Sequence, residues 1–84
     1  MKQSLKDEKL SATEHETLIL ICCNMKQKQV AEERCLDFET VQGHGKSIRA
    51  KFGCNTMATA VFKAYNQKTF SKKDIARIVE ALQL

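Results

Sequence analysis

Hydrophobic residues recur three and four positions apart along most of this chain, a spacing that places them on one face of an α-helix. The spacing predicts five helices, at about residues 12–23, 27–34, 38–52, 56–65 and 72–82. Two S-x-x-[DE] patterns, Ser11 with Glu14 and Ser71 with Asp74, predict capping boxes at the start of the first and last helices. Gly53 suits the left-handed conformation that ends the third helix. The chain is therefore predicted to be all-α.

Two hydrophobic segments need a further argument. The run LILICC, Leu18 to Cys23, could form a strand by composition, but the capping box before it and Asn24 after it favour a helix. The last predicted helix has an apolar stripe made of Ile75, Ile78, Val79 and Leu82. A short isolated helix is marginal in water, so this stripe needs a surface to pack on. It either folds back on the first and fourth helices of its own chain or crosses to a second copy.

The third helix contains two glycines, Gly43 and Gly45, and each costs about 1 kcal/mol relative to alanine in a helix interior. With Val41 taken as the inward direction, Gly43 points outward and Gly45 lies beside the buried stripe. The missing side chains predict close approach of a ligand on the outside and of the second helix on the inside. The alternative is a helix that no longer has its function and has accumulated glycines.

Composition limits the classes to which the chain can belong. Its 84 residues are enough for one small domain. The longest apolar run is too short to cross a membrane and the N-terminus is polar, so a cytoplasmic location is expected. The four cysteines have no metal-binding spacing, and no nucleophile–base pair or phosphate loop appears. We therefore expect no metal, no cofactor and no enzymatic activity, and we expect His15 to be exposed on the first helix.

Charge is divided unevenly along the chain. Residues 1–41 hold six Lys and Arg against eight Asp and Glu, whereas residues 42–84 hold eight against two. A basic half suits a polyanionic partner, although a solvated basic surface has the same composition. The second and third predicted helices form a helix-turn-helix pattern. The outward face of the longer helix presents Gln42, Lys46 and Arg49, which can contact adenine, guanine and phosphate.

Several short motifs occur in one register: Leu10, Ser11 and Glu14; Val30-Ala31; Thr40, Val41 and His44; Ile48; Lys51-Phe52-Gly53; and Ala60 with Ala64. In this register, residues 10–64 resemble the LuxR/GerE-type DNA-binding domain of bacterial transcription regulators, without gaps. The resemblance implies a helix-turn-helix four-helix unit at residues 10–66. It leaves residues 1–9 as a flexible N-terminus and residues 70–84 as an additional C-terminal amphipathic helix. It also implies that His44 packs and forms hydrogen bonds at the flank of the third helix.

The function implied by the resemblance is sequence-specific binding of double-stranded DNA in transcription regulation, with a recognition helix at about residues 38–52 in the major groove. The expected DNA contacts are Thr40, Gln42, Gly43, Lys46, Arg49, Lys28 and Lys51. Two copies would pair through the fourth helix and read a two-fold symmetric site. The residues expected at that dimer interface are Thr56, Ala60, Val61 and Ala64. The expected protein is cytoplasmic, associated with the nucleoid and without a sensor domain.

A second hypothesis is a protein-interaction module that binds and modulates another regulator without reading DNA. Glu39 near the DNA-facing start of the third helix, the acidity of residues 1–41 and the two glycines favour it. DNA binding that weakens with salt distinguishes the first hypothesis from the second.

Overall fold

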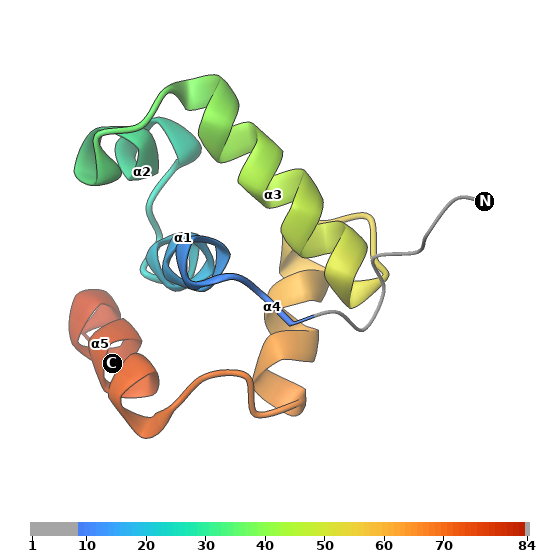
Figure 1. The fold of residues 1–84 in the computed structure, drawn as a ribbon. Helices are drawn as coiled ribbons and strands as arrows, with labels where there is room; N and C mark the ends of the chain where they lie inside the picture. Colours follow the sequence, from blue (N-terminus) through green and yellow to red (C-terminus); the bar gives the residue numbers. More distant parts are fainter. Residues whose placement is uncertain (1–8, 84) are drawn as a thin grey trace.

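Five α-helices form the described part of the chain, which in the computed structural model covers residues 9–83 (Figure 1). They are α1 (Ala12–Cys22), α2 (Gln27–Arg34), α3 (Phe38–Phe52), α4 (Met57–Asn66) and α5 (Lys72–Leu82). Residues 9–83 contain no strand. The predicted all-α class is therefore confirmed, and each helix begins and ends within one or two residues of its predicted bounds.

The capping groups predicted from the sequence define the ends of α1 and α5. The Ser11 hydroxyl accepts from the Glu14 backbone N–H at 3.1 Å, and a Glu14 carboxylate oxygen accepts from the Ser11 N–H at 2.9 Å. Ser71 and Asp74 repeat this reciprocal pair at 3.1 and 3.0 Å. Asp37 occupies the N-cap position of α3, but its side chain makes no capping hydrogen bond.

All four connections between helices use the left-handed backbone conformation. Each contains a residue with positive φ, and these residues are Asn24 (69°), Cys35 (55°), Gly53 (64°) and Lys68 (58°). The left-handed conformation lets the backbone N–H groups after a helix bond its last free carbonyls. Gly53 adopts the left-handed conformation without steric strain, whereas the Cβ atoms of Cys35 and Lys68 make it less favourable.

Helix α1 lies at the centre of the fold, with α2 and α3 on one side and α4 and α5 on the other (Figure 1). Three consecutive residues of α1, Leu18 to Leu20, are buried. Leu18 and Ile19 belong to a cluster that also contains Ile48, Phe52, Ala60, Ala64 and Phe70. Leu20 belongs to a second cluster, with Val30, Ala31 and Val41. A helix that is covered on several sides needs apolar residues around most of its circumference, which explains the run LILICC.

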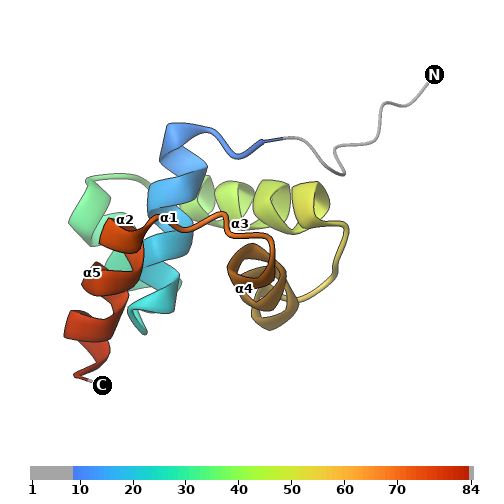
Figure 2. The same cartoon turned by 90° about the horizontal axis from the view of Figure 1, so that it is seen from below.

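Helix α5 packs on α1 of its own chain, so the intrachain alternative for the C-terminal helix is the one observed (Figure 2). Two side-chain pairs join the helices: His15 Nε2 lies 2.8 Å from Asp74 Oδ2, and Arg77 donates to both oxygens of Glu16 at 2.9 and 2.6 Å. The expectation that His15 is exposed is wrong, because its ring is half-buried between Asp74 and the edge of Phe70. The partner comes from a segment 59 residues away.

The residues expected at a dimer interface need a correction. Ala60 and Ala64 are both 0% exposed and pack inside the chain against the core cluster. Neither of these two side chains is accessible to a second copy, whereas Thr56 is exposed. Val61 is half-buried, and Thr56 caps α4 through a bond from the Thr59 N–H. The outward face of α4 is instead aromatic.

The ends of the sequence, residues 1–8 and residue 84, lie outside the described residues. This includes nearly all of the N-terminal segment that was expected to be flexible. Within residues 9–83, no helix combines the length and apolarity that a membrane span requires.

Candidate nucleic-acid interface

Helix α3 has one buried face and one exposed face, in the orientation that the sequence predicts. Val41 and Ile48 are fully buried, and Gly45 and Phe52 complete the inner side. Thr40, Gln42, Gly43 and Lys46 are exposed, whereas Arg49 is half-buried. The helix runs across the outside of the molecule, above α1 in Figure 1. Its outer face is therefore free to enter a groove of a ligand.

One flank of α3 adjoins the first residues of α2 and α4. A Cβ added to Gly45 would lie 3.4 Å from Arg49 Nη1, 3.5 Å from Met57 Cε and 3.7 Å from Gln27 Nε2. One end of the Arg49 guanidinium therefore lies over Gly45, near the side-chain ends of Met57 and Gln27. The predicted close approach at Gly45 is thus made by the ends of long side chains rather than by backbone. At Gly43 an added Cβ would meet nothing within 4 Å, as expected for an outward position.

Four residues gather on this flank and the adjoining part of the outer face, and we call them the basic surface: Lys28, Gln42, Lys46 and Arg49. Lys28 is exposed in the first turn of α2. Among residues 9–83, the ion pairs involve other residues, so none of the three cations of the basic surface is paired with an acid within 4 Å. Glu39 is exposed on the same side of α3 as Lys46 and reduces the positive potential there. The N-terminus of a helix carries a partial positive charge, so the first turn of α2, which holds Lys28, adds to the attraction for an anion.

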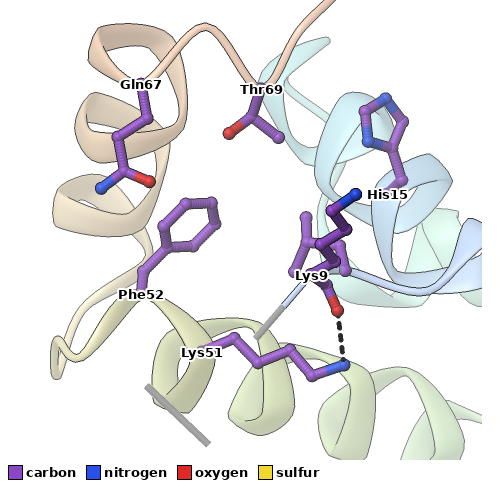
Figure 3. Close-up of a pocket in the computed structure, with 7 residues that line it drawn as sticks. Lys9, His15, Lys51, Phe52, Gln67 and Thr69 are labelled. Carbon is purple, nitrogen blue, oxygen red and sulfur yellow. Dashed lines mark hydrogen bonds between the residues drawn. The ribbon is translucent and has the colours of Figure 1, made fainter. Parts of the chain in front are cut away.

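Thr40 and Lys51, which the sequence analysis grouped with these residues, lie elsewhere. At 100° per residue, Thr40 is about 160° around the helix from Gln42. Lys51 is turned toward α1, where its Nζ lies 2.6 Å from Glu14 Oε1 and donates to the Lys9 carbonyl at 3.1 Å (Figure 3). The Lys51 side chain is only 13% exposed. Its position makes it a structural cation that joins α3 to α1.

Glu14 of α1 lies against the other flank of α3, which carries Ser47 and Lys51. Its carboxylate accepts hydrogen bonds from the Lys51 ammonium, the Ser47 hydroxyl and the Ser11 backbone N–H. Burial raises the pKa of Glu14, but the bonds from Lys51, Ser47 and Ser11 together outweigh it and lower that pKa from 4.5 to about 2. Glu14 therefore stays ionised at neutral pH and fixes the orientation of α3 on α1.

A polar pocket of about 400 Å³ lies beside Lys51, between the start of the described chain, the end of α3 and the loop after α4 (Figure 3). It is lined by Lys9, Leu10, His15, Lys51, Phe52, Gln67 and Thr69. The Lys51 ammonium is neutralised by Glu14, and His15 is bonded to Asp74. Two of the ionisable groups that line the pocket, Lys51 and His15, are therefore already paired within the chain.

Sequence reasoning missed an apolar element next to the basic surface. Phe38, the first residue of α3, is 45% exposed. It borders a shallow depression of about 480 Å³ that Lys26, Gln27, Lys28 and Met57 also line. The signal was present in the sequence, because Phe38 falls about 60° from Val41 and so outside the buried stripe. An exposed aromatic ring on this flank can contact thymine methyl groups.

His44 and the cysteines behave largely as packing residues. His44 is half-buried as expected, but its Nδ1 is buried without a hydrogen-bond partner among residues 9–83, so the expected hydrogen bond is not observed at that nitrogen. All four cysteines are free, and burial raises the pKa of the Cys22 thiol to about 11, which keeps it protonated and unreactive. Within the described residues, no group of three or more His, Cys, Asp and Glu side chains could hold a metal ion.

Comparison of this chain with protein-family models, curated proteins and solved structures finds no match. The functional interpretation therefore depends on the geometry of the basic surface and on the sequence resemblance alone.

Proposed function

We propose that this chain is a LuxR/GerE-type module that binds double-stranded DNA in transcription regulation and reads it with α3. The observation that carries the proposal is the basic surface, where Lys28 of α2 and Lys46 and Arg49 of α3 lie outside the ion pairs of residues 9–83. Cations gathered on one surface attract a polyanion and release its counterions on binding. The order of a short α2, a turn at Cys35 and a longer α3 supports the proposal, because a helix-turn-helix has this order of elements.

The exposed side of α3 supplies suitable chemistry for a major groove. The groove of B-DNA is about 12 Å wide and admits one α-helix. Open space beyond Gly43 permits the helix backbone to approach the base edges closely. Gln42 can pair with adenine and Lys46 with guanine, whereas Arg49, and Lys28 in the first turn of α2, suit phosphates.

We propose that one copy of the chain binds one half-site of the DNA. Ala60 and Ala64, two of the four residues expected at a dimer interface, are buried within the chain. The stoichiometry on an inverted repeat, measured by sedimentation of the complex, tests whether a second copy joins. A second copy that binds the repeat more tightly than the first would support cooperative pairing on DNA, whereas equal affinities of the two copies for their half-sites would exclude it.

The experiment that tests the proposal is selection of bound sequences from a random duplex pool, followed by fluorescence anisotropy on the selected duplex. Lys46→Ala and Arg49→Ala should each weaken binding by about 1–3 kcal/mol if the side chain contacts a base. If the contact is to phosphate, affinity should fall for all sequences and the salt slope should decrease by about 1.

Lys73→Ala is the matched control for these variants, because Lys73 is equally exposed but belongs to α5. It removes the same charge at a distance from the basic surface. Equal affinities for Lys46→Ala, Lys73→Ala and the wild type at low salt would contradict the proposal. Circular dichroism confirms that the variants remain folded.

The second candidate function is a protein-interaction module, and one observation favours it. Phe62 and Tyr65, on the outward side of α4, are 69% and 67% exposed. Aromatic residues exposed together on one surface are typical of protein interfaces. This surface lies apart from α3, so it can serve a partner whether or not the basic surface binds DNA.

A further inference from the structure

An apolar groove of about 540 Å³ lies between α4 and α5, on the side of α1 away from α2 (Figure 1). Its lining is Cys22, Ala58, Val61, Phe62, Tyr65, Phe70, Ile75, Ile78, Val79 and Leu82. Figure 2 shows the arrangement from below, with α1 between α5 and α4. Cys22 at the end of α1 and the buried Phe70 contribute to the lining, and the two helices form its walls.

The walls of the groove are apolar but not covered. On α4, Phe62 and Tyr65 are mostly exposed, and on α5 Val79 is 38% exposed. Ile78 packs against the core cluster, whereas Ile75 and Leu82 keep more than a third of their surface in water. The stripe of α5 is therefore only partly used within the chain, and its remaining side faces the groove.

The charged residues around the groove are unevenly placed. Lys72 stands three residues before Ile75 and so continues the same stripe at the first turn of α5. Lys68 lies in the loop that leads to it, and both side chains are exposed and outside the ion pairs of residues 9–83. Asp74 is turned to His15. The loop that joins α4 to α5 closes one end of the groove, and Lys68 and Lys72 at this loop belong to no ion pair of residues 9–83.

We infer that this groove binds an acidic amphipathic helix of a partner protein, with its apolar side between α4 and α5 and its carboxylates at Lys68 and Lys72. A groove between helices of 10 and 11 residues matches two to three turns of a ligand helix with apolar residues at i, i+3, i+4 and i+7. Charge complementarity selects an acidic ligand over a neutral or basic one. The inference is independent of DNA binding.

A second copy of this chain fits the groove less well. Its most amphipathic exposed helix is α5, and that helix brings Lys72, Lys73 and Arg77 with it. Two α5 helices joined in parallel would place Lys72 beside Lys72, and an antiparallel pair would place Lys72 beside the uncharged Leu82. The acidic residues of α1, Glu14 and Glu16, are already paired within the fold and cannot supply the complement.

The test uses two designed peptides of about 14 residues that share one leucine stripe and differ only in having glutamate or lysine at every charged position. Binding of each labelled peptide to the full chain is measured by fluorescence anisotropy. We expect the acidic peptide to bind at least about tenfold more tightly than the basic one. Val79→Asp should abolish binding, since it places a charge on the groove wall at a partly exposed position that tolerates it.

Lys68→Glu with Lys72→Glu should weaken the acidic peptide by about tenfold or more and strengthen the basic one. The matched control is Lys28→Glu with Lys46→Glu, which changes the net charge equally but lies on the basic surface. That control should leave peptide binding unchanged. Equal binding of the two peptides, or equal effects of the two double variants, would overturn the inference. A wild-type protein that sediments as a dimer and becomes monomeric with Val79→Asp would also overturn it, because a second copy would then cover the groove.

Discussion

Replacing Glu14 with glutamine removes the negative charge that joins α1 to α3. The amide keeps the size of the side chain, so packing changes little. It cannot neutralise Lys51, whose ammonium lies 2.6 Å away and is largely shielded from water. Removal of one partner from a buried pair leaves the other charge uncompensated, and this is more costly than removal of an exposed pair. Glu14→Gln should therefore destabilise the fold.

The decrease in the pKa of Glu14 gives the size of the stability loss expected for Glu14→Gln. A decrease from 4.5 to about 2 corresponds to about 3 kcal/mol of folding free energy. Because the folded-state pKa is the lower one, this contribution is complete above pH 4.5 and is lost as the pH falls toward 2. At pH 7 the variant should lose about 3 kcal/mol, a large part of the roughly 4–12 kcal/mol expected for a domain of this size. The difference from the wild type should fall to about 1 kcal/mol at pH 3.

Urea unfolding followed by circular dichroism, at pH 7 and pH 3, measures both differences. Glu16→Gln is the matched control, because Glu16 is on the same helix and pairs with Arg77, but at an exposed position. An exposed pair contributes under about 1 kcal/mol, so the control should be nearly neutral. The reasoning is refuted if Glu14→Gln and Glu16→Gln cost the same at pH 7, or if the cost of Glu14→Gln does not decrease with acid.

Three further substitutions test the backbone of α3 and of the turn before it, each by urea unfolding. Gly43→Ala should stabilise the fold by up to about 1 kcal/mol, because the added Cβ meets nothing within 4 Å, and it should weaken DNA binding in anisotropy if the helix backbone approaches the bases. Gly45→Leu should destabilise by about 1–3 kcal/mol, because a large side chain must displace the Arg49, Met57 and Gln27 ends; a neutral result would mean that those ends move freely. Cys35→Gly should stabilise by up to about 1 kcal/mol, since it relieves a left-handed residue whose side chain is exposed; a loss of stability would show that the thiol has a packing role.

The sequence predicts the features of this fold that depend on neighbours within one turn. Ser11, Ser71 and Gly53 mark helix ends because capping involves residues only three or four positions apart. The pairs His15–Asp74 and Arg77–Glu16 could not be predicted, because they join segments about 60 residues apart through a packing arrangement that periodicity does not specify.

The same distinction applies to the candidate site. Features that depend on one helix could be predicted, whereas features that depend on contacts between helices could not. The outward direction of Gln42 and Lys46 follows from helical geometry and is confirmed. The position of Lys51 does not follow from helical geometry. A lysine on the flank of a helix can face solvent or a buried acid, and only the placement of Glu14 decides between the two. Ala60 and Ala64 form a small apolar face in either case, but whether the chain itself or a second copy covers that face is a property of the tertiary fold.

The way in which α5 is attached to α1 determines how readily this helix separates from the rest of the fold. No residue of α5 is buried, and side-chain pairs with α1 make much of its contact. Segments with few buried contacts open at a small fraction of the global unfolding free energy. The amide protons of α5 should therefore exchange with solvent far faster than those of α1, and faster still at high salt, which screens the Arg77–Glu16 pair. Helix α5 can therefore detach from α1 while the core around Leu18 and Ile48 stays folded.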